Sequence, residues 1–230
     1  MKVIILAAGA CKRLGLSYPK ALLQLEDGTR LVDRVVDDVL EAQPKSLFLA
    51  VAGYKGDRLQ NALPEFDFVN NEQYQVTGPA YSLRLALEHL DSQEDVLVIS
   101  SDVCFQKGVL SSFIQNQKEH SSCLVAGHTE IEGNVKVELD HSKSILNIGH
   151  DIAGIAGTFP GIAYFRKDDV QALTKATKEI PDRSFWYEAI NHVIQEQNRK
   201  VAADRISDEF CHDIDTPEDL KFANTEIQKR

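Results

Sequence analysis

Short apolar runs alternate with amphipathic segments in the first half of the chain, and this alternation narrows the choice of fold more than any other feature. Residues 2–8, 46–52 and 95–101 form nearly continuous apolar runs, which are typical of parallel strands buried on both faces. Between them, apolar residues at 31–40 and at 80–90 recur at helical spacing. Strands that alternate with helices in this way predict an α/β fold built on a parallel sheet.

The second half of the chain predicts shorter strands that are separated by polar turns. Strands are expected at 122–126, 134–139, 144–148, 162–166 and 200–206. Helices are expected at 109–118, 168–179, 183–196 and from about Thr216 onward. A proline and two acidic residues mark the start of that last helix. This half is therefore expected to form a smaller β subregion beside the main sheet.

Composition excludes several classes of function. The 230 residues carry a formal net charge of -10, and such a surface repels nucleic acids and anionic membranes. No apolar run is long enough to cross a bilayer, and the N-terminus lacks the pattern of a signal peptide. The four cysteines lie far apart without zinc-ligand spacing, as in reduced intracellular proteins. We therefore expect a soluble, cytoplasmic protein that binds neither nucleic acid nor membrane.

Ligands of parallel α/β sheets bind beyond the carboxyl ends of the strands, and three loops of this chain meet that condition. They follow Ala8, follow Ser101 and precede Thr216. The first loop combines small residues with cations that include Arg13 and Lys20. Backbone amides and cationic side chains are what a triphosphate needs while its phosphorus is attacked. The alternative is a plain strand-to-helix turn with solvated basic residues.

The amino-acid sequence of the first loop also resembles that of a known family. Residues 6–15 read LAAGACKRLG and residues 19–25 read PKALLQL, which resembles the LAAGxGxRL and PKxLxxL signature of nucleotidyltransferases that activate sugar phosphates. The resemblance implies that Arg13 and Lys20 grip the nucleotide phosphates as the catalytic residues. It also implies a nucleotide cradle made by the backbone of Leu6, Ala7, Ala8, Gly9 and Ala10. Cys11 replaces the second glycine of the signature, which either weakens nucleotide binding or is accommodated with a negative φ.

Two aspartates in the other loops are candidate magnesium ligands. Asp102 follows a buried apolar run, and Asp215 lies in the segment HDIDTPEDL at 212–220. Proteins usually hold Mg²⁺ with one or two carboxylates together with phosphate oxygens. Aspartates at these two places bind the metal in the family that the chain resembles, which implies that Asp102 and Asp215 hold Mg²⁺ here. The alternative is that these aspartates cap a helix or a turn.

A further segment, NNEQYQVTGPAYSL at 70–83, resembles part of the cytidylyltransferases for phosphocholine and 2-aminoethylphosphonate. Glu72 stands where these relatives have proline. The resemblance implies that the nucleotide is CTP and that four residues contact it: Asn71, Thr77, Ala80 and Ser82. The alternative is a helix N-terminus that has Ser82 in its first turn and binds no ligand.

The acceptor side of the expected site is less well marked. Residues 157–165 resemble a strand that lies beside the acceptor in the family, although Thr158 replaces its glutamate. Two aromatic residues and a carboxylate follow later in the chain, and such groups can form a cage for a quaternary ammonium ion. We expect four residues on this side to contact the acceptor: Trp186, Tyr187, Glu188 and Asp213. The alternative is that the aromatic residues belong to the core.

Together, these resemblances imply a single-domain, Rossmann-like (GT-A-like) α/β fold with a mixed, mainly parallel sheet flanked by helices. Residues 1–230 would form one nucleotidyltransferase domain, in which about 1–120 bind the nucleotide and about 121–230, with the C-terminal helix, bind the acceptor. The expected reaction transfers CMP from CTP to phosphocholine or 2-aminoethylphosphonate and releases pyrophosphate, with Mg²⁺ as the cofactor.

Two other interpretations stay open. A sugar 1-phosphate or an inositol phosphate is the alternative acceptor, with CTP or another nucleoside triphosphate as the donor. A non-catalytic nucleotide-binding module would explain Cys11 and Thr158, but such a module needs no pair of separated metal-binding carboxylates. An NAD-binding Rossmann domain is excluded, because the loop after Gly9 lacks GxGxxG spacing. The sequence also leaves open whether the chain forms a homo-oligomer.

Overall fold

The computed structural model describes residues 1–90, 94–117, 119–127, 134–206 and 210–228. Its strands are β1 Lys2–Ala7, β2 Leu47–Ala52, β3 Asp67–Asn70, β4 Val96–Ser100, β5 Val103–Phe105, β6 Ser121–Ala126, β7 Lys136–Leu139, β8 Ile145–Gly149, β9 Gly157–Thr158, β10 Ile162–Phe165, β11 Val201–Ile206 and β12 Cys211–Asp213. Its α-helices are α1 Leu31–Ala42, α2 Gly56–Ala62, α3 Pro79–His89, α4 Val109–Gln115, α5 Lys167–Glu179, α6 Trp186–Gln195 and α7 Pro217–Ile227. Two 3₁₀ turns, η1 Lys12–Leu14 and η2 Lys20–Leu22, follow β1.

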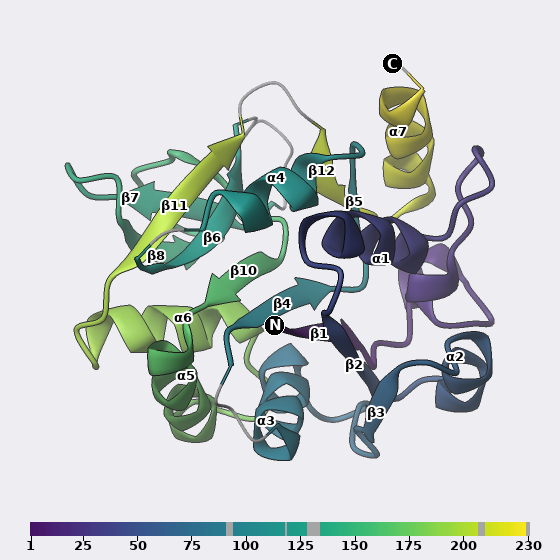
Figure 1. Ribbon diagram of the computed structural model, residues 1–230, viewed down its shortest axis with the longest axis horizontal. Coiled ribbons are helices and arrows are strands. Elements are labelled where there is room, and N and C mark those ends of the chain that lie inside the picture. Colours follow the sequence, from purple (N-terminus) through teal and green to yellow (C-terminus); the bar gives the residue numbers. More distant parts are fainter. Residues whose placement is uncertain (91–93, 118, 128–133, 207–209, 229–230) are drawn as a thin grey trace.

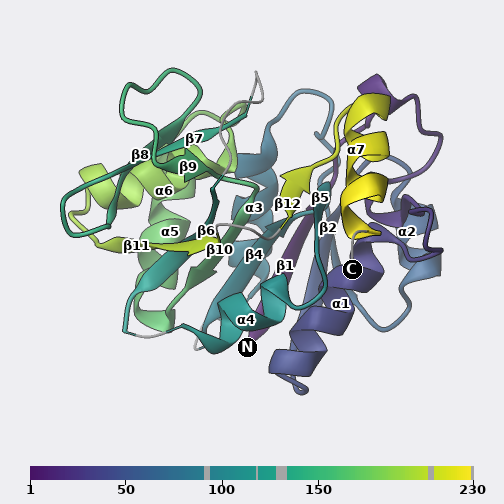
Figure 2. The same cartoon turned by 90° about the horizontal axis from the view of Figure 1, so that it is seen from above.

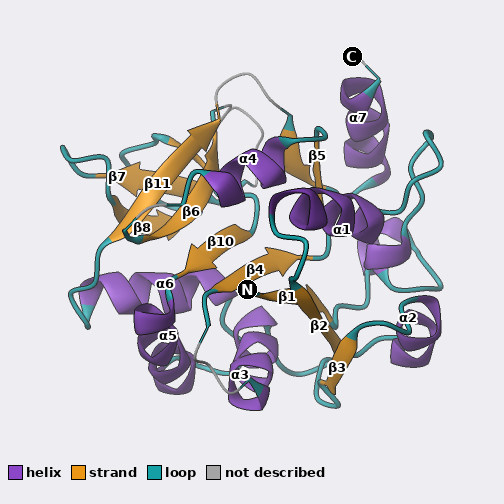
Figure 3. Ribbon diagram, in the orientation of Figure 1, coloured by secondary structure: helices purple, strands orange, loops and turns teal. Residues whose placement is uncertain are grey.

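A mixed sheet, ten-stranded across the described residues, organises the molecule (Figures 1 and 3). Its order is β3-β2-β1-β4-β10-β6-β9-β7-β8, and β11 pairs with β6 outside this path. Strands β3, β2, β1 and β4 are parallel, so their carboxyl ends lie along one edge of the sheet. Strand β10 is antiparallel to both β4 and β6, and it joins the parallel half to the second half of the sheet.

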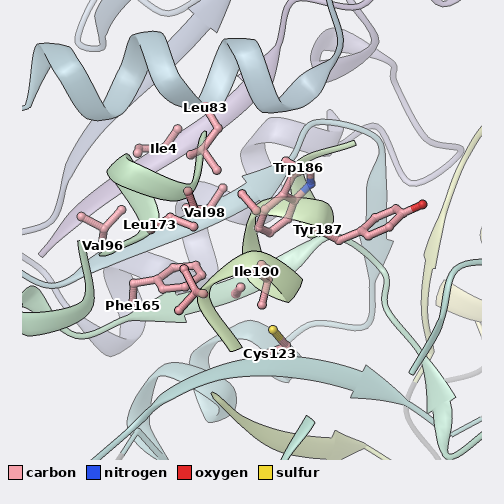
Figure 4. Close-up of a cluster of buried hydrophobic side chains, with 14 of the residues drawn as sticks. Ile4, Leu83, Val96, Val98, Cys123, Phe165, Leu173, Trp186, Tyr187 and Ile190 are labelled. Carbon is pink, nitrogen blue, oxygen red and sulfur yellow. The ribbon is translucent and has the colours of Figure 1, made fainter. Parts of the chain in front are cut away.

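Helices cover both faces of the sheet (Figure 1). One face carries α3, α5 and α6, which contact one another, and the other carries α1 and α4. The side chains of β1 alternate between these faces, because successive residues of a strand point to opposite sides. Ile4 and Leu6 enter the first core, shown in part in Figure 4, whereas Val3 and Ile5 enter the second. The expected α/β fold with a mixed sheet flanked by helices is confirmed.

A small ribbon places the C-terminal segment beside the end of β4. Strand β12 pairs antiparallel with β5, which begins directly after Asp102, and α7 then packs beside β5 (Figure 2). Asp213 lies opposite Val103 in this ribbon, and the Ile214 amide donates to the Asp102 carbonyl at 2.9 Å. The ribbon therefore brings residues that are more than a hundred positions apart in sequence to the same edge of the main sheet.

The structure differs from the sequence-based expectation at several element ends. Strands β5 and β12 were not expected, because runs of three residues are too short to show a period. The strand that the resemblance implied at 157–165 is divided into β9 and β10. Helix α6 begins at Trp186 and not at residue 183, since Phe185 is extended and its amide donates to Glu188 at 2.8 Å. Helix α4 ends at Gln115, and residue 118 of the expected helix lies outside the described residues. None of the described helices has the length and apolar character needed to cross a membrane.

Candidate active site

A cavity of about 290 Å³ opens where β1 and β4 end, and we refer to it as the first cavity. Four segments build its wall: the loop after β1, residues 71–82, residues 100–102 and the segment before α7. The wall includes Leu6, Ala8, Gly9, Arg13, Lys20, Asn71, Thr77, Ser82, Ser100, Asp102 and Asp215. Ala7, Ala10 and Ala80, also expected to contact the nucleotide, are not part of this wall. The three loops predicted to hold ligand thus meet around one space.

A charge centre lies in the first cavity. The Lys20 ammonium nitrogen is 3.2 Å from Asp102 Oδ2 and 2.7 Å from Asp215 Oδ1. Arg13 reaches the other oxygen of Asp215 at 2.5 Å. Burial alone would lower the pKa of Lys20, but the carboxylates of Asp102 and Asp215 outweigh burial and raise it. Lys20 therefore stays protonated at neutral pH, although its residue is only 8% exposed.

The carboxylate of Asp215 is held free of the helix that follows it. Thr216 caps α7: its hydroxyl accepts from the Asp219 amide at 3.2 Å. The Asp219 carboxylate accepts in turn from the amides of Asp215 and Thr216, at 2.9 and 2.7 Å. The alternative in which Asp215 caps the helix is therefore not observed. Its side chain instead contacts Lys20 and Arg13.

The chemistry of these groups fits a magnesium ion. Among the described residues, no group of three or more acidic, histidine or cysteine side chains could enclose a metal by itself. Mg²⁺ does not require such a cage, because it keeps waters and phosphate oxygens as ligands beside one or two carboxylates. Asp102 and Asp215 supply two carboxylates that already converge on one ammonium group. A nucleotide would bring the remaining oxygen ligands.

The loop after β1 corrects the expectation for Cys11. This residue has φ 47° and ψ 41°, so it adopts the left-handed conformation that favours glycine, and the condition of a negative φ is not met. Its sulfur lies 3.6 Å from the Gly9 carbonyl oxygen, on the wall of the first cavity. Burial raises the pKa of the Cys11 thiol, and the ammonium of Lys20 offsets only part of that effect. The thiol is therefore protonated at neutral pH.

Two hydroxyl groups of the first cavity share one amide. Asn71 Nδ2 donates to Thr77 Oγ1 at 3.1 Å and to Ser82 Oγ at 3.0 Å. Asn71 is 1% exposed, and its Oδ1 accepts from the Gln73 amide at 3.0 Å. Both polar atoms of the Asn71 side chain thus form hydrogen bonds within the protein, whereas Thr77 and Ser82 line the cavity. Ser82 also lies within α3, as the alternative interpretation expects.

A second cavity, also of about 290 Å³, adjoins the first. Its wall is formed by Asn134, Val135, His150, Thr158, Phe159, Pro160, Phe185, Cys211, His212 and Asp213, together with Arg13 and Asp215. The pair of Arg13 and Asp215 therefore stands at the border of both cavities. Burial raises the pKa of Asp213, and the nearby charge of Asp102 raises it further. Asp213, which the sequence analysis expected on the acceptor side, lies in this wall.

None of the other three residues expected on the acceptor side lines either cavity, and two of them have other roles. Trp186 is 4% exposed and lies among the core side chains (Figure 4). Its indole nitrogen donates to Ser100 Oγ at 3.1 Å. Glu188 caps α6 by accepting from the Phe185 amide and from the Ser184 hydroxyl, at 2.8 and 2.9 Å. Both side chains thus form hydrogen bonds within the protein. The expected cage for a quaternary ammonium ion does not include them.

Two rings that the sequence analysis did not single out, those of Phe185 and His150, line the second cavity. Phe185 lies in the wall of the second cavity, is 50% exposed and stacks on Tyr187 with ring centroids 5.5 Å apart. His150 meets Phe185 edge to face at 6.0 Å and lines the same cavity. Tyr187 stands behind Phe185 and not in the wall itself. The position next to Trp186 could have pointed to Phe185, but no local signal marks His150.

Ser100, at the end of β4, is held in place by Trp186 and by the backbone of Gly161. Besides the bond from Trp186, the backbone of Gly161 passes so close that a Cβ there would lie 2.5 Å from Ser100 Oγ. Gly161 also has φ 90°, which favours glycine. Trp186 in turn meets Phe159 edge to face at 5.0 Å, and Phe159 lines the second cavity. Trp186 therefore touches residues of both cavity walls.

Comparison with known proteins places these features in a family. The model of the MobA-like NTP transferase domain matches residues 3–189. The bifunctional protein GlmU of Legionella pneumophila (strain Corby) is 31% identical over 136 residues, which are 57% of this chain and 29% of that protein. The matched part is less than a third of the length of this curated relative.

Two solved structures share the fold over nearly the whole chain. The inositol-1-phosphate CTP transferase from T. maritima has a TM-score of 0.79 and 21% identity, and covers 99% of this chain and 96% of its own. The CTP:phosphocholine cytidylyltransferase from Streptococcus pneumoniae has a TM-score of 0.79 and 17% identity, and covers 97% of both chains. The nucleotidyltransferase resemblance inferred from the first loop is thereby confirmed at the level of family and fold. Because the family model covers most of the sequence, this chain belongs to the MobA-like NTP transferase domain family.

Proposed function

We propose that the chain transfers CMP from CTP to a phosphorylated or phosphonylated small alcohol or amine and releases pyrophosphate, with Mg²⁺ as the cofactor. The observation that carries this proposal is the charge centre of Lys20, Arg13, Asp102 and Asp215, which stands where the two cavities meet. An enzyme that joins two anions needs cations at the place where they meet, with a separate space for each substrate on either side.

The chain's own residues account for much of the chemistry. The acceptor phosphate is already ionised at neutral pH, so its oxygen can attack the α-phosphorus without a general base. Lys20 and Arg13 would neutralise the phosphates of the donor and hold them in line with the acceptor. Asp102 and Asp215 would hold Mg²⁺, which supplies further positive charge at the transferred phosphoryl group. The Arg13–Asp215 contact would have to open as the substrates enter.

The choice of CTP rests on the segment 70–83 and the hydroxyls of Thr77 and Ser82 in the first cavity. Small hydroxyls at this wall suit the polar edge of a pyrimidine. The backbone of Gly78 lines the same cavity and is held in place by residue 184, since a Cβ on Gly78 would lie 2.4 Å from the Ser184 carbonyl oxygen. Two proteins that share the fold are named as users of CTP, which supports the same choice.

The second cavity would receive the acceptor. The exposed face of Phe185, the ring of His150 and the carboxylate of Asp213 suit a cationic head group, because aromatic faces and carboxylates both attract cations. Phosphocholine and 2-aminoethylphosphonate carry such a group and are our first choice. Asn134 and His212 in the same wall favour a hydroxyl-rich acceptor, so a sugar 1-phosphate or an inositol phosphate is the second candidate.

The proposal includes the whole chain as one catalytic domain. Arg13 comes from the nucleotide-binding part and Asp215 from the acceptor-binding part, and their contact belongs to both cavities. Neither part would hold a complete charge centre without the other. A division near residue 120 therefore describes which substrate each part contacts and not two independent units.

Pyrophosphate release provides the direct test. The purified chain is mixed with each of the four nucleoside triphosphates and with phosphocholine, 2-aminoethylphosphonate, glucose 1-phosphate or inositol 1-phosphate. We expect release with CTP and one of the two amine-bearing acceptors, loss of release with excess EDTA, and recovery when Mg²⁺ is restored. Calorimetric binding of CTP without pyrophosphate release from any pair would support the non-catalytic module and contradict the proposal.

A further inference from the structure

We propose that Asn71 sets the base specificity of the first cavity by fixing the directions of two hydroxyl protons, without touching the base itself. The inference rests on the proposed function for the nature of the ligand, a nucleoside triphosphate. The arrangement of protons comes from the hydrogen bonds of Asn71, Thr77 and Ser82 alone. Asn71 is therefore a positioning residue, not a catalytic one.

The orientation of the Asn71 amide follows from its partners. The backbone N–H of Gln73 can only donate, and it lies 3.0 Å from one terminal atom of Asn71, which must then be the oxygen Oδ1. The other terminal atom is the nitrogen, which donates to Thr77 and Ser82 at 3.1 and 3.0 Å. Solvent cannot compete for these bonds, because Asn71 is 1% exposed.

The hydroxyl proton of Thr77 forms a hydrogen bond within the protein. Thr77 Oγ1 lies 2.9 Å from the carbonyl oxygen of Gln73, and a carbonyl can only accept, so the Thr77 hydroxyl donates there. The same oxygen accepts one N–H of Asn71. One lone pair is left, and toward the cavity Thr77 can therefore act as an acceptor only.

Ser82 has the opposite character. Its oxygen accepts from Asn71, and within the described residues no acceptor for its own proton lies at hydrogen-bond distance. The residue is 4% exposed and lines the first cavity. An unpaired donor in a buried position is costly, so a ligand that accepts this proton gains affinity. The pair thus offers one fixed acceptor and one free donor side by side.

This pattern is complementary to cytosine. The edge of cytosine carries an amino group, which donates, beside a ring nitrogen, which accepts. Uracil in the same position carries an oxygen beside a ring N–H that donates. The oxygen meets the lone pair of Thr77, which is repulsive, and the Ser82 hydroxyl can accept from the N–H only by turning its own proton away, which leaves that proton unpaired. A site that hydrogen-bonds one partner of such a pair rejects the other strongly, because its own polar groups are left unpaired. Asn71 would hold the pair in the order that selects CTP.

The substitution Asn71→Asp tests this order. Aspartate keeps the acceptor for the Gln73 amide but cannot donate, so the Ser82 proton turns toward residue 71 and only lone pairs face the cavity. We expect the ratio of CTP to UTP affinity, measured by calorimetry without acceptor, to fall about tenfold or more. Asn70→Asp is the matched control, because Asn70 is exposed and only accepts from Gln60, at 3.1 Å. Its ratio should stay that of the parent.

Two uncharged variants keep the test decisive if a buried carboxylate prevents folding. Ser82→Ala removes the donor and Thr77→Val removes the acceptor, and each should lower the CTP to UTP ratio while Thr77→Ser preserves it. Equal loss of CTP and UTP affinity in all variants would overturn the inference. A parent chain that prefers CTP but releases no pyrophosphate would refute the proposed catalysis and leave the role of Asn71 intact. A parent that releases pyrophosphate but binds both nucleotides equally would refute the role of Asn71 and the choice of CTP, and would leave the proposed transfer reaction intact.

Discussion

The first and second cavities share Arg13 and Asp215 but are assembled in different ways. Most of the first cavity comes from short stretches of sequence, such as the loop after β1 and residues 71–82. The second is built from runs of only two or three residues, at 134–135, 158–160 and 211–213, together with single residues such as His150 and Phe185. The residues of the first wall can therefore be recognised in short segments of sequence, whereas those of the second wall are brought together only by folding.

This difference separates what the two cavities are expected to do. Charge and backbone dominate the first, because phosphates are the same in every nucleotide and need the same partners. Aromatic rings and single polar groups line the second, where the shape and charge of the acceptor would be read. The comparison predicts that substitutions in the first cavity change turnover, whereas substitutions in the second change the choice of acceptor.

The largest expected effect concerns the charge centre. Lys20→Ala and Asp102→Ala should each lower kcat by about 10²-fold or more, because each removes a charge that stabilises the transferred phosphoryl group. Pyrophosphate release at saturating CTP measures the loss. Lys175→Ala and Asp37→Ala, at exposed positions far from both cavities, serve as charge-matched controls. If both active-site variants stay within tenfold of the parent, the first cavity is not the reaction centre.

A smaller effect should separate the second cavity from the first. Phe185→Ala removes the exposed aromatic face, and loss of a cation–π contact of about 1–2 kcal/mol raises the KM of phosphocholine roughly tenfold. The KM of CTP should not change, because Phe185 is not part of the first cavity. Phe185→Tyr keeps the face and should restore binding. A parallel rise in both KM values would erase the distinction between the cavities.

Trp186→Phe should affect both cavities modestly, because Trp186 holds Ser100 on one side and meets Phe159 on the other. Loss of the hydrogen bond to Ser100 costs about 1 kcal/mol, or roughly fivefold in the KM of CTP. The acceptor KM should rise to a similar extent through the displaced Phe159. Phe165→Leu, in the same core but away from Ser100, controls for general loosening. An effect equal to that of the control would remove Trp186 as a link.

The smallest expected effect concerns the rate at which Cys11 is chemically labelled. Cys11 is partly exposed and the other three cysteines are buried, so iodoacetamide should label Cys11 first in the folded chain. Because burial raises the pKa of Cys11, labelling should be slow at pH 7 and should still accelerate at about pH 9 as thiolate forms. CTP with Mg²⁺ should protect Cys11, whereas phosphocholine alone should not. Protection by phosphocholine alone would place the acceptor in the first cavity.

Much of the fold and of the first cavity could be predicted from the sequence. Buried parallel strands leave continuous apolar runs, so β1 was predicted from local pattern. The same pattern made Lys20 and Asp102 candidates, and the family resemblance supplied their roles. Their convergence followed from the rule that parallel strands end at one edge of the sheet. Asp215 required the family resemblance, because the strand β12 that carries the preceding residues is only three residues long.

The second cavity could not be predicted in the same way. Trp186 and Glu188 were assigned to it from residue type, but direction along α6 decides which side chain faces the cavity and which the core. Trp186 points to Ser100, Glu188 turns back to cap the helix, and Phe185, just before the helix, is the residue that reaches the cavity wall. His150 lies between two strands in a stretch without periodicity, and only tertiary packing places it beside Phe185.

The ribbon of β5 and β12 has a consequence for how this protein can be inactivated. The C-terminal segment carries Asp215 and is attached to the body of the molecule in two ways. Three residue pairs join β12 to β5, and Ile214 and Ala223 pack with Leu23, Leu25 and Leu31 in a third apolar cluster. Any tag, proteolytic cut or antibody that detaches it would remove one of the two carboxylates and would also open this third apolar cluster. Such a molecule would lose stability and activity together, so a lowered unfolding temperature would report the loss of Asp215.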